Sequence, residues 1–277
     1  MKTVLSLYAV LASLLAATAH AQTKEALETA QRLVVRSGIS VQLRSMPQQF
    51  DPELALARGS LPDEVITALG EAAKQSFVPE ALQADITQSL AAGLSVADMK
   101  QALDWLDTGA GRRITAAEVH AAGSMTPQAM QAHLESLKRK PHSARRAELL
   151  AQLVVATKGV EHTANLVEGV ALGIAMGMDA TQPVQKRQGL RDLRERLRSA
   201  MPPERIRESV AAALPNMYGY IYRDVTDADL SGYLQFSRSA AGARYNDAVI
   251  AAFTEAMVRA SVRMGPAIER ALQKKST

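Results

Sequence analysis

A stretch of glycine and arginine is the first group of residues whose types and spacing suit chemistry. Residues 106–113 read LDTGAGRR. Such a loop can bind phosphate, because backbone N–H groups and guanidinium groups both attract anions. The competing interpretation is a joint between two helices, in which Thr108 caps the second helix. A repeat elsewhere in the chain helps to decide between the two.

A row of arginines makes the segment 185–201 a second candidate. Four arginines recur at helical spacing: Arg187, Arg191, Arg194 and Arg198. Four apolar residues predict a parallel seam on the same helix: Leu190, Leu193, Leu197 and Met201. Such a charged row is usually a solvated helix face. The functional alternative is binding to an anionic lipid surface or another polyanion.

Aromatic residues gather between Tyr218 and Phe253. Tyr218 and Tyr222 are four residues apart, so a helix places them on one face. This clustering favours an apolar core, and the alternative is a pocket lined by phenols.

Metal and cofactor chemistry has little support in the sequence. The histidines His120, His133, His142 and His162 do not form a pair at helical ligand spacing. The methionines of this Ala- and Leu-rich chain are typical gap fillers in a core. The chain has no Gly-x-Ser-x-Gly, no His-Glu-x-x-His, no cysteine and no dinucleotide fingerprint. We therefore expect no metal and no cofactor, and we lean against an enzyme.

Three glycines follow at four-residue spacing within EGVALGIAMGM: Gly169, Gly173 and Gly177. They share one helix face, and each costs up to about 1 kcal/mol of helix stability relative to alanine. Close packing against another helix would compensate for this cost. We expect that contact to lie within the chain or across a homodimer, and a groove for an apolar lipid tail is the alternative.

An internal repeat connects residues 94–114 with residues 225–245. The two stretches align without a gap, at an offset of 131 residues. The first carries Thr108, Gly111 and Arg113, and the second carries Ser239, Gly242 and Arg244 at the equivalent positions. The second stretch has Ala240 where the first has Gly109, so only one glycine of the presumed phosphate loop is repeated. The repeat therefore favours the helix joint.

The repeated pattern resembles the bacterial exported family called domain of unknown function 2059. An aromatic residue precedes Ser or Thr by three positions, and a glycine follows three positions later. Trp105, Thr108 and Gly111 fit this pattern, as do Phe236, Ser239 and Gly242. The tyrosine and proline of the family's usual motif are replaced in both stretches. The resemblance implies a helical, exported protein and implies no particular chemistry.

The composition and the first residues bound the remaining expectations. Residues 1–21 have the basic start, apolar run and Ala19-His20-Ala21 cleavage site of a signal peptide. We therefore expect a protein that is soluble in the periplasm or secreted after cleavage. The chain has no cysteine, and its formal net charge of +4 gives no reason to expect nucleic-acid binding.

Strong helix formers dominate most windows and predict an all-α fold. We expect two tandem related helical units, packed as one helical array. The units are residues 22–140 and 144–277, and the second repeats the helical plan of the first.

Three functions remain open. The first is a non-enzymatic binding or interaction module for an unknown protein or envelope component. The second is an envelope-acting hydrolase with a pair of carboxylates, and the third is an anionic-lipid binder through the arginines. A deep polar pocket with converging carboxylates would favour the hydrolase.

Overall fold

The fold is built from helices throughout the parts of the chain that the structure, a computed structural model, describes: residues 23–46 and 63–273. The predicted all-α class is therefore confirmed. The predicted signal peptide lies outside these ranges. Helical segments at residues 23–36 and 39–46 come first, with Gly38 in the left-handed region at a φ of 76° in the turn between them.

The later elements follow one another with short connections. In chain order they are α3 (Asp63–Ser76), α4 (Pro79–Gly93), α5 (Val96–Leu106), α6 (Gly109–Ser124), α7 (Pro127–Arg139), α8 (Ala144–Ala156), α9 (Gly159–Thr181), the 3-10 turn η1 (Val184–Lys186), α10 (Gly189–Ala200), α11 (Pro203–Ile221), α12 (Asp227–Arg238) and α13 (Ala240–Gln273).

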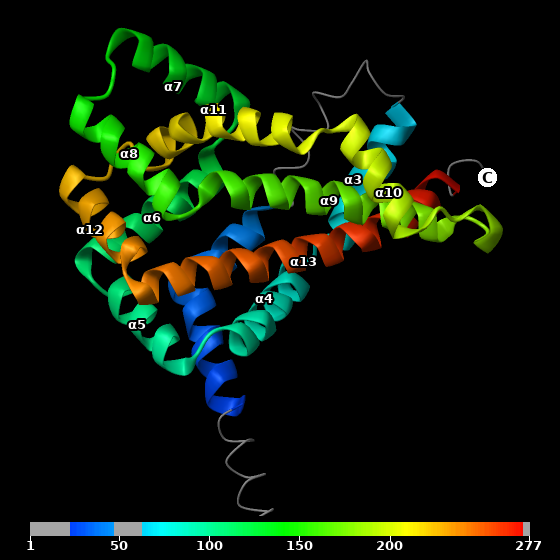
Figure 1. The fold of residues 1–277 in the computed structure, drawn as a ribbon, viewed down its shortest axis with the longest axis horizontal. Coiled ribbons are helices and arrows are strands. Elements are labelled where there is room, and N and C mark those ends of the chain that lie inside the picture. The colour runs from blue at the N-terminus through cyan, green and yellow to red at the C-terminus, as the bar shows by residue number, and fades with distance from the viewer. Residues whose placement is uncertain (1–22, 47–62, 274–277) are drawn as a thin grey trace, which may run out of the picture.

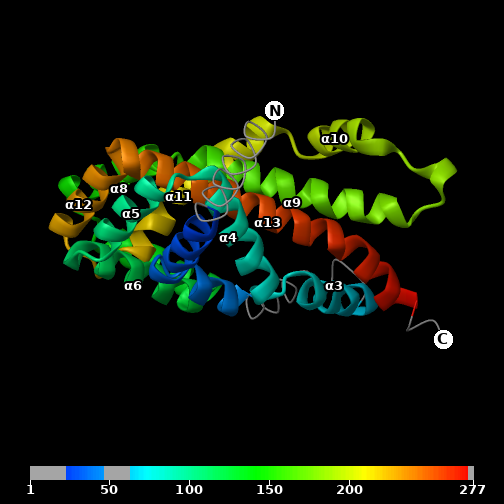
Figure 2. The ribbon, with the colours of Figure 1, turned by 90° about the horizontal axis from the view of Figure 1, so that it is seen from below.

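Two long helices, α9 and α13, run side by side through the middle of the molecule (Figure 1). Helices α3, α4 and α5 pack on α13, and α10 covers part of α9 (Figure 2). The largest apolar core lies along α13 and includes Leu33, Leu82 and Met99. A smaller core joins α6, α8 and α12 around Ile114, Leu153 and Leu230, among others.

Gly169, Gly173 and Gly177 form a glycine strip on α9 that lies against α13. Gly173 and Gly177 are buried. A Cβ atom placed on Gly173 would lie 2.9 Å from the carbonyl oxygen of Val258, and one on Gly177 would lie 2.2 Å from that of Val262. Since only glycine leaves room for these carbonyls, Gly173 and Gly177 reflect backbone-to-backbone packing within the chain, whereas Gly169 faces the side chain of Val258.

Both copies of the repeated motif are joints between helices. The Thr108 hydroxyl accepts a hydrogen bond from the Gly111 N–H and donates one to the carbonyl of Trp105. Ser239 makes the equivalent two bonds, to Gly242 and to Phe236. A Cβ atom on Gly111 would lie 2.2 Å from the Trp105 carbonyl oxygen. The close neighbour of this glycine is thus the end of the preceding helix, not a third helix.

The second half departs from the helical plan that we expected it to repeat. In the first half, Thr126 and Pro127 end α6 and start α7, where Thr126 is the N-cap. At the equivalent positions, Met257 and Val258 continue a single helix, α13, to Gln273. The reason is local, because Met and Val provide neither a capping hydroxyl nor a proline ring.

No helix within the described ranges has both the length and the apolar character needed to cross a membrane.

Candidate functional site

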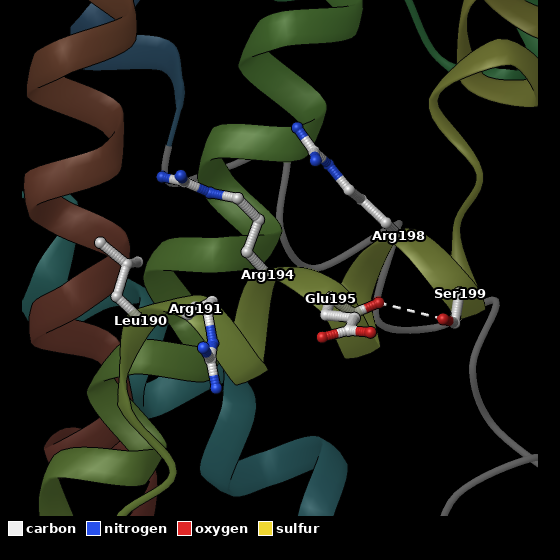
Figure 3. Close-up of a pocket in the computed structure, with 6 residues that line it drawn as sticks. All are labelled: Leu190, Arg191, Arg194, Glu195, Arg198 and Ser199. Atoms are coloured by element: carbon white, nitrogen blue, oxygen red, sulfur yellow. Dashed lines mark hydrogen bonds between the residues drawn. The ribbon is translucent and has the colours of Figure 1, made fainter.

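The four arginines of the predicted row do not all lie on one helix. Arg191, Arg194 and Arg198 lie on α10, and Figure 3 shows Arg191 pointing away from the other two. A hollow of about 730 Å³ beside them is lined by residues of α10 alone. One helix cannot enclose a ligand, so this hollow is an open surface feature.

Two sequence-based expectations about this segment are wrong. Arg187 precedes α10, which begins at Gly189, a glycine with a φ of 77°. The Arg187 guanidinium donates to the carbonyls of Ala180 and Gln182 near the end of α9, so it leaves the helical row. The apolar seam is also incomplete, because Leu193 is buried whereas Leu190 is 46% exposed. The segment turns before the helix starts, and among the described elements α10 packs mainly on α9.

The candidate site is a cleft of about 560 Å³ between α6, α9, α11, α12, α13 and the N-terminal segment. Four tyrosines and one carboxylic acid line it, together with aliphatic side chains. The polar and aromatic lining residues used below are Glu118, His162, Tyr218, Tyr222, Tyr233, Tyr245 and Asn246. A volume of this size suits a small molecule.

Among the described residues, Glu118 is the one acidic side chain that lines this cleft. It lies on the same face of α6 as the buried residues Ile114 and Ala121. Burial raises the pKa of Glu118 to about 7, and a 2.8 Å hydrogen bond from the Tyr222 hydroxyl to Oε1 partly opposes that shift. Near neutral pH the cleft therefore holds a carboxyl group that exchanges readily between its charged and neutral forms.

The tyrosines surround this carboxyl group as a connected set of rings. The Tyr222 ring meets the rings of Tyr218 and Tyr233 edge to face, with centroids 5.6 and 6.1 Å away. Burial raises the pKa of all four tyrosines, and the charge of Glu118 raises it further. The phenols are therefore neutral hydrogen-bonding groups over the physiological range.

Helix α8 holds Tyr218 and Tyr222 in place through contacts at both of its ends. Arg146 of α8 donates to the carbonyls of Tyr222 and Val225 and to the carboxylate of Asp227. The Tyr218 hydroxyl lies 2.9 Å from Oγ1 of Thr157, at the end of α8. These contacts fix where the two phenols enter the cleft.

Two nitrogen atoms beside the cleft have no hydrogen-bond partner. Asn246 is 7% exposed, and its Nδ2 atom is buried and unpaired. The Nε2 atom of His162 is likewise unpaired and lies 3.6 Å from Oδ1 of Asp247. Burial lowers the pKa of His162, which favours its neutral form. Buried polar groups without partners are rare, and they are often found at binding sites.

The cleft brings together only part of what the sequence singled out. Tyr218 and Tyr222 both line it, whereas the arginines of α10 do not. Glu118 was missed, although the pattern ITAAEVHAA places it on the apolar face of its helix. An acidic residue on such a face is a signal for a buried carboxyl group. Tyr233, Tyr245 and Asn246 come from other helices, and no local pattern joins them to Tyr218.

The repeated motif has a structural role beside the cleft. Arg113 of α6 donates two hydrogen bonds to Asp229 of α12, at 2.8 and 2.7 Å. The equivalent Arg244 of α13 donates two to Asp98 of α5, at 3.0 and 2.6 Å. Each arginine therefore pairs with the acid of the other motif. Both pairs lower the pKa of the carboxyl groups, that of Asp229 to about 2.

Metal-ligand geometry is not found among the described residues, where no three His, Cys, Asp or Glu side chains gather. The rings of His133 and His142 do approach each other, with centroids 6.2 Å apart beside Tyr220. Burial lowers the pKa of both imidazoles, so they are neutral at pH 7.

The described residues thus form an all-α fold around a cleft lined by four phenols and the carboxyl group of Glu118. Residues 80–140 match the model of a family described as "Uncharacterized protein conserved in bacteria (DUF2059)". The matched region includes the first copy of the repeated motif and supports this family for that part of the chain. No curated protein and no solved structure matches the chain.

Proposed function

We propose that this protein is a non-enzymatic binding protein that holds a small amphipathic molecule in the cleft. The observation that carries the proposal is the lining itself. One carboxyl group and four phenols face a volume of about 560 Å³, and aliphatic residues such as Leu166 and Val249 cover the rest. Mostly apolar walls with a few placed polar groups are typical of ligand pockets.

The hydrolase alternative requires two carboxyl groups across the reacting bond. The cleft has Glu118, and no second acidic residue among the described residues lines it. Val249 lies 131 residues after Glu118, just past the second motif as Glu118 lies just past the first. It also lines the cleft. This difference favours binding over hydrolysis.

A neutral solvatochromic dye, Nile red, tests the proposal. We expect its fluorescence to rise in the presence of the protein, and we expect Val249→Trp to abolish the rise by filling the cleft. Val155→Trp is the matched control, because Val155 is 76% exposed on α8. Equal dye binding by both variants, with unchanged melting temperatures, would contradict the proposal.

We also propose that the chain arose by duplication of one helical unit. The crossed pairs Arg113–Asp229 and Arg244–Asp98 support this, because reciprocal contacts are what two copies related by a two-fold axis make. Export to the periplasm or the exterior stays part of the proposal. Appearance of a mature protein that begins at Gln22 in the periplasmic or secreted fraction would test it.

A second candidate function, docking on an anionic lipid surface, is favoured by the end of the α9–α10 hairpin. Figure 2 shows this hairpin projecting at one end of the molecule. Exposed apolar side chains, Met178, Val184 and Leu190, lie there next to the arginines of α10. Apolar side chains flanked by basic ones are typical of segments that lie in a membrane interface.

Sedimentation with vesicles of phosphatidylglycerol and phosphatidylcholine tests this second function. We expect binding at low salt that fades as salt rises, since the Debye length falls from about 10 Å at 0.1 M to about 3 Å at 1 M. Replacing Arg191, Arg194 and Arg198 by Gln should remove it. The control replaces three other exposed arginines, Arg145, Arg205 and Arg207. Binding that survives the first triple change would refute the idea.

A further inference from the structure

We propose that the ligand of the cleft carries a positively charged ammonium group, which lies against Glu118 and the faces of the surrounding tyrosines. This inference rests on the proposed binding function and specifies the chemistry of the ligand. The ligand class is an amine or quaternary ammonium compound with an apolar body.

The first argument is the charge balance of the cleft. Glu118 has no cation of its own, because no basic side chain among the described residues is close enough to shift its pKa. Glu118 is half-buried, and a carboxylate in such a position without a counter-ion is costly, so a cationic ligand would reduce that cost. Tyr222 donates to Oε1, which leaves Oε2 for such a ligand.

The second argument is the set of rings around the carboxyl group. Tyr218 and Tyr222 lie edge to face at an interplanar angle of 86°, and Tyr222 and Tyr233 lie at 68°. Aromatic rings in several orientations therefore line one space. Aromatic faces attract ammonium groups, and aromatic cages are a common means of binding quaternary ammonium ligands.

The other titratable groups that face this space do not compete for the charge. They are Tyr218 and Tyr222 of α11, Tyr233 of α12, Tyr245 of α13 and His162 of α9. The tyrosines are neutral because their pKa values are raised, and His162 is kept neutral by burial. The charge that a ligand meets in the cleft is therefore negative.

The apolar side chains that line the cleft indicate the chemistry of the rest of the ligand. Ile39, Leu166, Val249 and Phe253 present an apolar wall. Asn246 also lines the cleft and its Nδ2 donor is unpaired, so a hydrogen-bond acceptor on the ligand would give this donor a partner. The proposed ligand thus has an ammonium group, an apolar body and room for one acceptor.

Three probes of matched length test the inference by isothermal titration calorimetry with the purified full chain: hexyltrimethylammonium, heptanol and heptanoate. We expect the cation to bind roughly tenfold or more tightly than the alcohol, and heptanoate to bind most weakly. The affinity for the cation should rise between pH 5.5 and 8.5 as Glu118 ionises, whereas that for heptanol should not change.

Glu118→Gln should remove the preference for the cation and its pH dependence while heptanol still binds. Glu204→Gln is the matched control, because Glu204 is exposed at the start of α11. Melting curves show that each variant is folded. A preference for heptanoate, or a cation preference that survives Glu118→Gln, overturns this inference and leaves the binding function standing. If none of the three probes binds, the proposed function itself fails.

Discussion

The indole ring of Trp105 lies flat on the phenyl ring of Phe236, with centroids 4.3 Å apart and planes 8° apart. The two residues occupy equivalent positions in the two copies of the repeated motif, so the copies meet at a pair of like residues. The crossed arginine–aspartate pairs connect the same two motifs. Equivalent parts of the chain thus contact each other reciprocally, as the halves of a symmetric dimer do.

The crossed ion pairs should depend on charge complementarity. We expect Asp98→Arg and Arg244→Asp each to lower the melting temperature, because each leaves two like charges in contact. The double variant should regain part of the loss, since it restores an opposite pair with reversed polarity. The control is the exposed pair of Lys100 and Glu25, where the same reversals should change little. Losses that simply add in the Asp98–Arg244 double variant would show that the charges do not interact.

Replacing glycine by alanine should have opposite effects on stability at Gly173, in the glycine strip, and at Gly123, in α6. Gly173→Ala should destabilise by roughly 1–3 kcal/mol, because its Cβ would lie 2.8 Å from that of Ser261 and 2.9 Å from the Val258 carbonyl oxygen. Gly123→Ala, where nothing lies within 4 Å of the new atom, should stabilise by roughly 0.5–1 kcal/mol. Urea unfolding measures both.

Gly173→Leu should cost more than Gly173→Ala, because bulk is what the α9–α13 contact cannot accept. A Gly173→Leu variant as stable as the wild type would refute the packing interpretation.

The helix joints predict a similar loss of stability when the glycine that both motifs share, Gly111 or Gly242, is replaced. Gly111→Ala should destabilise strongly, by roughly 2 kcal/mol or more, because its Cβ would overlap the Trp105 carbonyl. Gly242→Ala should behave alike, since its Cβ would lie 1.9 Å from the Phe236 carbonyl oxygen. Gly109→Ala is the control, because only the flexible guanidinium of Arg113 lies near and the second motif has Ala240 there. Thermal unfolding that ranks Gly109→Ala as the worst of the three would contradict the joint geometry.

The carboxyl group of Glu118 predicts how stability depends on pH. Its pKa is about 7 in the folded protein against a reference value of 4.5. Between these values the folded protein holds a proton that the unfolded chain has lost, so folding takes up a proton and stability falls as the pH rises. The share of Glu118 is at most about 3 kcal/mol.

Glu118→Gln should therefore have little effect at pH 4.5 and should stabilise the protein relative to the wild type at pH 8. Guanidinium unfolding at a series of pH values measures the difference. A stability difference that stays constant over this range would show that Glu118 titrates normally.

Acid should weaken the crossed pairs in a separate pH window. The pKa of Asp229 is lowered to about 2, chiefly by the hydrogen bonds from Arg113. Its contribution is present above the ordinary pKa of 3.8 and is lost as the pH falls towards 2. Asp229→Asn should lower stability at pH 7, and the difference from the wild type should shrink between pH 4 and 2. Circular dichroism during acid titration follows the change, and a difference that persists at pH 2 would speak against the ion pair.

The helical class and the starts of four helices could be predicted from the sequence alone. Ser95, Thr108, Thr126 and Thr226 each accept a hydrogen bond from an N–H three residues later, which is a local interaction that spacing reveals. The glycine spacing likewise indicated that a backbone passes close to α9. These features depend on residues within a few positions of one another, so the one-dimensional pattern contains them.

Which distant residues of the chain contact one another is known only from the three-dimensional fold. Nothing near Arg113 points to Asp229, and nothing near Gly173 points to Val258, since the two members of each contact come from helices far apart in the chain. The cleft depends still more on the fold, because Glu118 and the tyrosines come from four helices. The row of arginines is also interrupted, because Arg187 precedes α10 and donates to the Ala180 carbonyl of α9. Local hydrogen bonds set the ends of the helices, but long-range packing brings the carboxyl group and the phenols into one space.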